Sequence, residues 1–202
     1  PEVKRIIKAF NIPVIERDGF EADDVIGTLA KKAIQDDPKC EVFMVTPDKD
    51  FAQLVEKGIY MFKPAKGGNE PEILDVDKIK EQWDIETPDQ VIDILGLWGD
   101  ASDNIPGVPG IGEKTAKKLI SKYSSIENIL ENVNDLKGKQ KENLENFSDQ
   151  ALLSKKLVTI ITDAPVDLDW KDLKLSEINK DELSKICIEF EFNAIGKRLL
   201  GD

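Results

Sequence analysis

The chain has 202 residues, with 28 Lys and Arg against 40 Asp and Glu, and therefore a formal net charge of −12. It contains no His, which excludes Ser-His-Asp and Cys-His catalysis, an imidazole base and His-ligated zinc. Its two cysteines, Cys40 and Cys187, cannot form a Cys₄ zinc site or a disulfide framework, so a reducing cytoplasm is expected. No apolar run reaches the roughly 20 residues that span a membrane, and we expect no membrane partner.

The first part of the chain alternates between helical and extended patterns. Its predicted elements are helix 3–10, strand 12–15, helix 21–34, strand 41–46, a short helix at 49–56, and strands 59–62 and 72–74. Gly67-Gly68-Asn69 predicts the turn that makes the last two strands a hairpin. The alternation indicates an α/β layer with a largely parallel sheet, in which 41–46 is the best candidate for the central strand.

After about residue 75 the pattern becomes helical throughout. The predicted helices are 75–83, 88–98, 112–123, 125–132, 138–147, 149–160 and 180–190. No linker rich in Pro or Ser separates the two parts, so we expect them to pack tightly. We place the division between an α/β core at 1–87 and a helical region at 88–202.

Three groups of acidic residues lie at the ends of predicted elements. They are Glu21, Asp23 and Asp24 at a helix start, Asp48 and Asp50 after strand 41–46, and Asp100 and Asp103 after a helix. Each group alone has a structural explanation, because acids stabilise helix starts, cap helices and form turns. Together, seven carboxylates without nearby basic partners would repel one another if the sheet edge gathered them, and a cation would relieve that repulsion. All-oxygen ligands favour Mg²⁺ or Mn²⁺, and two such ions can promote phosphodiester cleavage.

A glycine-rich turn at 104–112 precedes a basic helix start. Its glycines permit positive φ angles and close approach of another backbone, and the free N–H groups of the helix form an anion site. One interpretation is a tight helix–helix turn with solvated lysines. We favour binding of duplex phosphates, which positions DNA without reading its sequence. The candidate DNA-binding residues are Gly107, Gly110, Gly112, Lys114, Thr115, Lys117 and Lys118.

Three motifs, in this order, resemble the 5′-3′ exonuclease domain of bacterial DNA polymerase I, within the flap endonuclease superfamily. They are GFEADDVIGTLA at 19–30, VTPDKDFAQL at 45–54 and GDASDNIPGVPGIGEKTAKKLI at 99–120. The resemblance covers nearly the whole chain. It implies a PIN-like α/β core with a parallel sheet, followed by an all-helical region that contains a helix–three-turn–helix, or helix–hairpin–helix-like, DNA-binding motif.

The resemblance also implies roles for individual residues. All seven acids would belong to a site for two or more Mg²⁺ or Mn²⁺ ions, with Asp48, Asp50 and Asp103 in the catalytic set. The glycines would hold the duplex backbone, and carbonyls at Gly107, Val108 and Ile111 would hold K⁺. The implied substrate is duplex DNA with a 5′ flap or 5′ end, cleaved during replication and repair in the bacterial cytoplasm. A polymerase domain is expected in the same protein.

Two other hypotheses remain open. Members of the family begin with a strand that carries an Asp, a second Asp and a basic helical arch, and these precede the Glu-Ala-Asp-Asp motif. They are absent from this chain, which opens at Pro1, so the sequence is interpreted as N-terminally truncated. The chain could therefore be a catalytically inactive module that only binds duplex DNA. A general PIN-like ribonuclease is the third hypothesis, and the duplex-binding turn argues against it.

Overall fold

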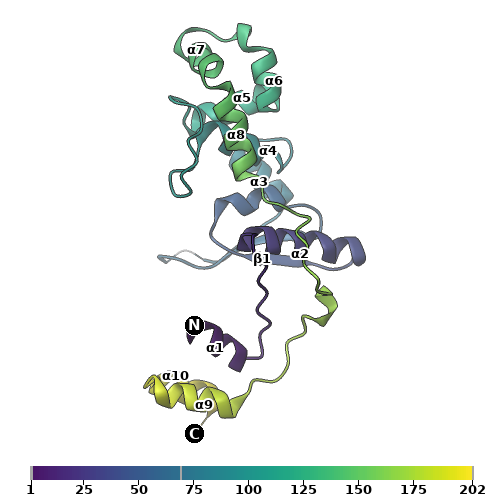
Figure 1. Cartoon of the computed structure of the whole chain (residues 1–202), viewed down its shortest axis with the longest axis vertical. Coiled ribbons are helices and arrows are strands. Elements are labelled where there is room, and N and C mark those ends of the chain that lie inside the picture. Colours follow the sequence, from purple (N-terminus) through teal and green to yellow (C-terminus); the bar gives the residue numbers. More distant parts are fainter. Residues whose placement is uncertain (1, 69, 202) are drawn as a thin grey trace.

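The computed structural model describes residues 2–68 and 70–201, so Pro1 and the last residue of the predicted turn, Asn69, lie outside the described residues. Figure 1 shows three tiers, with α5–α8 at one end, the sheet with α2 in the middle, and α1, α9 and α10 at the other end. The elements are α1 Glu2–Ala9, α2 Ala22–Asp36, β1 Val42–Val45, η1 Lys49–Leu54, β2 Ile59–Lys63, β3 Glu72–Leu74, α3 Val76–Trp83, α4 Gln90–Trp98, α5 Glu113–Tyr123, α6 Ile126–Glu131, η2 Val133–Asp135, α7 Gly138–Asn146, α8 Ser148–Val158, η3 Trp170–Asp172, α9 Lys180–Glu189 and α10 Asn193–Leu200.

The sheet has the order β1-β2-β3. Strand β1 runs parallel to β2, and β2 pairs antiparallel with β3, which confirms the predicted strands 41–46, 59–62 and 72–74. The described sheet is therefore mixed, not largely parallel as predicted, because the β2–β3 hairpin supplies an antiparallel pair. The prediction that 41–46 is the central strand is wrong for the described sheet, because β2 lies between the other two. Burial explains the difference: Ile59 and Met61 of β2 are 0% exposed, whereas Val45 of β1 is 67% exposed.

One hydrophobic core runs from the sheet into the helical region. Ile59 and Met61 of β2 belong to the same buried cluster as Ile94 and Leu97 of α4 and Ile120 of α5. Helix α4 packs against α5 and α8 as well as against η1. The two parts therefore pack tightly, as expected, and the division at 87/88 stays a prediction because no break in the core marks it.

The third tier is a smaller cluster at the two ends of the described chain. Ala9 of α1 is buried against Leu183, Ile186 and Cys187 of α9. Helix α10 was not among the predicted helices; Gly196 lies inside it, and glycine is a poor helix former. Among the described helices, none combines the length and the apolar character that crossing a membrane requires.

The predicted strand 12–15 is wrong. These residues form an extended connection between α1 and α2 that pairs with no strand among the described residues. Ile12 is 44% exposed and Val14 is 38% exposed, so the apolar run is not a buried strand. Pro13 lacks the N–H group that a sheet ladder needs, which makes a connecting role the more stable choice.

Candidate metal centre

The acidic residues converge on one cleft. A cavity of about 510 Å³ opens between the start of α2, the turn into η1, the loop after α4 and the segment that follows α8. It is lined by Glu21, Asp23, Asp24, Asp48, Asp50, Asp103, Ile105, Lys156, Leu157, Val158, Thr159, Ile160 and Ile161. Asp100 joins Asp50 and Asp103 in a cluster whose carboxylate oxygens lie within 4.8 Å of one another.

The turn from β1 into η1 places two of the acids. Asp48 is the N-cap of η1, and its Oδ1 accepts a hydrogen bond from the backbone N–H of Asp50 at 3.1 Å. Asp50 is only 8% exposed, and its Oδ1 is buried and accepts no hydrogen bond from the described residues. The pKa of Asp50 is raised to about 6: burial raises it most, Lys49 lowers it, and the negative charges of Asp48, Asp100 and Asp103 raise it. The ionised form of Asp50 is therefore disfavoured in this site, and a bound cation would stabilise it.

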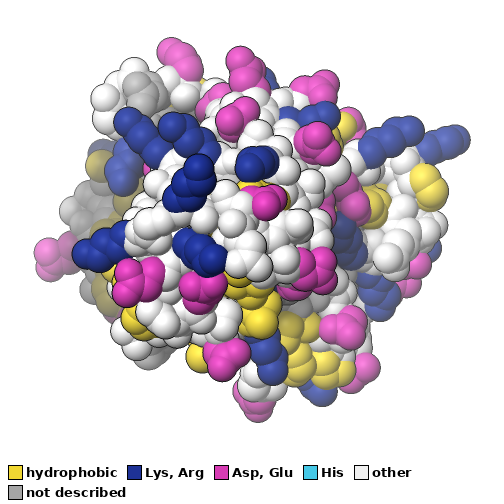
Figure 2. Space-filling model, turned by 90° about the horizontal axis from the view of Figure 1, so that it is seen from above, with side chains coloured by type: hydrophobic (Ala, Val, Ile, Leu, Met, Phe, Trp, Pro, Cys, Tyr) yellow, Lys and Arg dark blue, Asp and Glu magenta, His cyan; other side chains and the backbone are white. Residues whose placement is uncertain are grey.

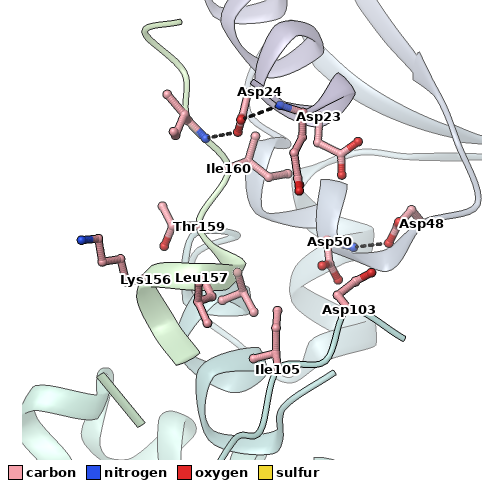
Figure 3. A pocket seen from close by; sticks show the side chains of 13 residues that line it. Asp23, Asp24, Asp48, Asp50, Asp103, Ile105, Lys156, Leu157, Thr159 and Ile160 are labelled. Carbon is pink, nitrogen blue, oxygen red and sulfur yellow. Dashed lines mark hydrogen bonds between the residues drawn. The ribbon is translucent and has the colours of Figure 1, made fainter. Parts of the chain in front are cut away.

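The loop after α4 presents the next two acids. Gly99, with φ +82°, ends the helix, and paired backbone hydrogen bonds between Asp100 and Ile105 close the loop at 2.9 and 2.7 Å. In this closed loop, Asp103 is exposed and lines the cleft, whereas Asp100 is buried. In Figure 3, Asp50 and Asp103 point toward each other.

Lys49 corrects the expectation that the acids have no basic partner. Its Nζ forms an ion pair with Oδ2 of Asp100 and lies 3.5 Å from Oδ1 of Asp50. Although burial raises the pKa of Asp100, the hydrogen bond from Lys49 and that from the backbone of Ser102 bring it below its usual value. The signal for this role was Lys49 itself, which stands between Asp48 and Asp50 in the motif.

The start of α2 holds its three acids differently. Glu21 is the N-cap and forms a capping box with Asp24. Oδ2 of Asp24 accepts from the backbone N–H of Glu21 at 3.1 Å, and Oδ1 accepts from that of Ile161 at 2.8 Å. Asp24 therefore lines the cleft with both oxygens already used by the fold. The pKa of Asp23 is raised by burial and then by the negative charges of Asp48, Glu21, Asp24 and Asp103.

The donor set fits a hard divalent cation. The buried Oδ1 of Asp50 is the clearest sign, because it accepts no hydrogen bond from the described residues and has only the ammonium of Lys49 nearby, at 3.5 Å. Asp50, Asp100 and Asp103 are the residues that can hold a first ion, with Asp23 and Asp48 beside them. Lys49 contributes one positive charge to this group, which leaves most of its negative charge uncompensated.

The wall opposite the acids was not identified from the sequence. It consists of residues 156–161, at the end of α8 and directly after it. In Figure 3, Lys156 lies across the cleft from the acids with its ammonium group turned away from them. The only signal was the Lys155-Lys156 pair before an apolar run, which carries no specific chemical meaning.

Gly107 is required by the fold. Its φ is +59°, and an added Cβ would lie 2.5 Å from the carbonyl carbon and 2.7 Å from the carbonyl oxygen of Trp98. Its N–H donates to Oγ of Ser154 at 3.1 Å, and its carbonyl accepts from Nε2 of Gln150 at 2.6 Å. The close backbone approach predicted for this glycine is thus made by α4 of the same chain.

Gly112 and Gly110 are exposed. Gly112 is the N-cap of α5 with φ −93°, and an added Cβ there meets no atom within 4 Å. Gly110 has φ +77° and lies beside α7, where Asn143 donates to the carbonyl of Pro109 at 2.7 Å. The start of α5 therefore opens outward, as duplex binding requires. The carbonyl of Val108 accepts from Ile111 at 3.0 Å, and the potassium site stays a prediction.

The lysines of α5 fall into two groups. Lys114 and Lys118 are exposed and Thr115 is half-buried. Lys117 instead packs against α3: its Nζ lies 2.9 Å from Glu113, donates to the carbonyl of Gln82 at 3.0 Å and lies 5.1 Å from the ring centroid of Trp83. Lys117 is therefore held by the fold, and two of the three predicted DNA-binding lysines face solvent.

Two family descriptions match the chain. Residues 1–84 match "5′-3′ exonuclease, N-terminal resolvase-like domain", and residues 86–181 match "5′-3′ exonuclease, C-terminal SAM fold". DNA polymerase I of Bacillus subtilis is 42% identical over 200 residues, which are 98% of this chain and 22% of that protein. DNA polymerase I of Caldicellulosiruptor bescii is 41% identical over 98% of this chain and 23% of its own length. The chain thus spans about a fifth of the length of these relatives.

Solved structures agree in fold. T5 5′-exonuclease with bound zinc has a TM-score of 0.63 and 23% identity, over 89% of this chain and 62% of that one. The catalytic core of Rad2 in complex with DNA substrate has a TM-score of 0.65 and 16% identity, over 98% of this chain and 66% of that one. The predicted fold class, an α/β core followed by a helical region, is confirmed. With its two consecutive family matches and its relatives at about 40% identity, the chain belongs to the 5′-3′ exonuclease family found in bacterial DNA polymerase I.

Proposed function

We propose that the protein that carries this chain is a divalent-metal-dependent 5′-3′ exonuclease and structure-specific 5′ flap endonuclease that acts on duplex DNA in replication and repair. The observation that carries this proposal is the convergence of acids from three separate motifs on one cleft, around a buried oxygen of Asp50 that accepts no hydrogen bond among the described residues. Membership of the 5′-3′ exonuclease family supports the same reaction class.

The acids have distinct tasks in this proposal. Asp50, Asp100 and Asp103 hold the first Mg²⁺ or Mn²⁺ ion, and Asp23, Asp48 and Glu21 supply oxygens toward a second. When bound, such ions polarise the phosphodiester and activate a water molecule. Asp48 also fixes the start of η1, and Lys49 orients Asp100. Asp24 is the least well supported ligand, because both of its oxygens accept backbone hydrogen bonds and it lies outside the cluster of Asp50, Asp100 and Asp103.

The duplex is held at the tier formed by α5–α8, which adjoins the cleft (Figure 1). Gly112 and the start of α5 offer free N–H groups for a phosphate, and Lys114 and Lys118 add exposed positive charge. Figure 2 views this end of the molecule from above and shows Lys and Arg side chains gathered on part of it. Exposed Lys137 and Lys139, at the start of α7, extend the basic character of this end. A potassium ion at the carbonyls of Gly107, Val108 and Ile111 is part of the proposal.

The relatives suggest the wider context. They are bacterial DNA polymerase I proteins, of which this chain spans about a fifth. We therefore place a polymerase domain in the same protein and the protein in the bacterial cytoplasm. Its substrate would be a duplex with a 5′ flap or a 5′ end.

The decisive experiment uses the full-length protein with a labelled 5′-flapped duplex. Cleavage is expected in Mg²⁺ or Mn²⁺ and its loss in excess EDTA, and Asp50→Asn and Asp103→Asn should each reduce the rate at least about 100-fold. Glu131→Gln, which removes the same charge from an exposed position in α6, is the matched control and should cleave normally.

Three outcomes would contradict the proposal. Undiminished cleavage in EDTA would exclude the metal requirement. Duplex binding without cleavage by the full-length protein would support a non-catalytic binding module. A preference for single-stranded RNA over the flapped duplex would support a general PIN-like ribonuclease.

A further inference from the structure

The wall of the cleft opposite the acids has no regular secondary structure. Residues 159–161 follow α8 and line the cleft, but they belong to no helix or strand. Their backbone N–H and C=O groups are therefore not paired by the hydrogen bonds of a helix or a sheet. Because buried backbone groups without partners are strongly disfavoured, side chains from elsewhere must satisfy them.

Gln53 supplies two of these hydrogen bonds. Its Nε2 donates to the carbonyl of Val158 at 2.9 Å, and its Oε1 accepts from the N–H of Ile160 at 2.9 Å. Gln53 is 8% exposed and lies in η1, three residues after Asp50. One side-chain amide thus pairs with the wall as a neighbouring strand would, from the same short helix that carries a metal-site acid.

Helix α2 fastens the next part of the same wall. Asp24 accepts from the N–H of Ile161 at 2.8 Å, and Thr28 accepts from the N–H of Ala164 at 3.0 Å. Ile160 also packs on Gly27, where an added Cβ would lie 3.1 Å from its Cγ2. The two elements that carry acids on one side of the cleft therefore hold the wall on the other side.

Helix α8 itself is attached to the glycine turn. Ser154 and Gln150, both on α8, hydrogen-bond the N–H and the carbonyl of Gly107. A continuous set of contacts thus runs from the turn through α8 to the wall, and from the wall through Gln53 to Asp50. The turn is also joined to Asp100 and Asp103 directly by the chain, and this second path links it to Asp50 on the other acid-bearing element.

We propose that Gln53 is a positioning residue that fixes the register between the duplex-binding turn and the acidic cleft, and so determines which phosphodiester is cut. This rests on the proposed nuclease function. In this role Gln53 acts through its hydrogen bonds to the wall and does not contact the duplex. Neighbouring phosphates on one strand are about 3.4 Å apart along the helix axis, so a small shift of the wall and α8 presents the adjacent bond.

The first test maps cut positions on a 5′-flapped duplex with the full-length Gln53→Met protein. This change keeps the side-chain length and removes both hydrogen bonds. Wild type should cut at one main position, whereas Gln53→Met should spread its cuts over neighbouring phosphodiesters. Its kcat should fall about tenfold from the loss of alignment, with KM within about twofold.

Gln90→Met is the matched control. Gln90 is 7% exposed and also bonds at both ends, since its Oε1 accepts from Glu86 at 2.8 Å and its Nε2 donates to Ser124 at 3.0 Å. It does not line the cleft. The control should lower the melting temperature to a similar degree and leave the cut position unchanged. A spread of cuts in both variants would mean that general loosening, not Gln53, causes the effect.

A second readout does not depend on cleavage. In the 202-residue chain, hydrogen exchange of the Ile160 amide should be at least about tenfold faster in Gln53→Met, because exchange requires that hydrogen bond to open. The amide of Met61 in β2 should exchange at an unchanged rate. If Gln53→Met does not fold, Gln53→Glu takes its place: it keeps the acceptor for Ile160, loses the donor to Val158, and should spread its cuts over more positions than wild type does.

The outcomes separate the two proposals. A folded Gln53→Met or Gln53→Glu protein that cuts at the wild-type position with the wild-type kcat overturns the role of Gln53 alone. Unchanged exchange at Ile160 in Gln53→Met also overturns it. Absence of cleavage by wild type in Mg²⁺ overturns the nuclease function, and the exchange result would then still show whether Gln53 holds the wall.

Discussion

The acidic cleft and the glycine turn are built in opposite ways. The cleft draws its acids from three motifs distributed between residues 21 and 103, whereas the turn is one continuous stretch. Yet the dispersed acids share one location, while the continuous motif divides into two roles: Gly107 and Lys117 serve the fold, and Gly112 and Lys118 face solvent. Gathering carboxylates in one cleft costs electrostatic energy, so their convergence indicates a shared function. A continuous motif, by contrast, can combine residues that stabilise the fold with residues that are free to contact a ligand.

The largest expected effect distinguishes the two glycine roles. Gly107→Ala should lower the free energy of unfolding by at least about 3 kcal/mol, because the new Cβ meets the backbone of Trp98 at a positive φ. Gly112→Ala should change it by less than about 0.5 kcal/mol, since that position is open. Urea denaturation of the 202-residue chain measures both. An equal loss of stability in both variants would contradict the assignment of Gly107 to the fold and of Gly112 to the exposed surface.

The next prediction concerns Asp50 and pH. Its pKa is raised from 3.8 to about 6 in the folded protein, so its ionisation costs stability. In EDTA this cost is absent well below pH 3.8, accumulates as the pH rises from about 4 to 6, and stays on the order of 2–3 kcal/mol above that. Asp50→Asn should therefore be more stable than wild type at pH 8, and most of that difference should be gone near pH 4. A less stable variant at pH 8 would show that Lys49 overcompensates for burial.

Lysines of α5 test the duplex surface. Changing Lys114 and Lys118 together to Gln should weaken duplex binding about tenfold and reduce the salt slope by roughly 2, because two phosphate contacts are lost. Fluorescence anisotropy across salt concentrations measures the slope. Lys117→Gln is the matched control: it should leave the slope unchanged while lowering stability by about 0.5–1 kcal/mol. If Lys117→Gln reduced the salt slope and the double variant did not, the duplex would contact the side of α5 that faces α3.

The smallest expected effect tests the role of Asp48 as the N-cap of η1. Asp48→Ala removes the acceptor for the Asp50 N–H and should cost about 1 kcal/mol in EDTA, offset in part by reduced repulsion. Asp48→Asn keeps an acceptor and should be at least as stable as wild type. Thermal melts of the two variants in EDTA make the comparison. If both lose stability equally, the charge of Asp48, not its cap, supports the fold.

Periodicity predicted most of the fold because its signal is local. Apolar residues at helical spacing located α1–α9, and short apolar runs located the three strands. The strand at 12–15 failed because an apolar run containing Pro13 does not show by itself whether it will be buried. The order of the sheet and helix α10 depend on tertiary contacts that no local pattern encodes.

The sequence predicted which residue types form the site, but only part of how they are arranged. Carboxylates in three motifs indicated a cation, and the structure brings them to one cleft. The ion pair between Lys49 and Asp100 joins residues 51 positions apart, and the clamp of Gln53 on Ile160 joins residues 107 positions apart. Such pairs follow from the folded topology, and the sequence around each partner carries no sign of the other.

The contact between α1 and α9 makes most of the chain a closed ring. The N–H of Asn179 donates to the carbonyl of Ala9 at 2.9 Å, and Arg5 pairs with Glu189 at 2.7 Å. Two extended segments leave this junction for the body of the molecule (Figure 1). A protease that nicks one of them would not release the end tier, because the other would still tether it. Within the described chain, detaching a helix of this tier from the body requires cleavage of both segments, or cleavage of one together with separation of α1 from α9 (Figure 1).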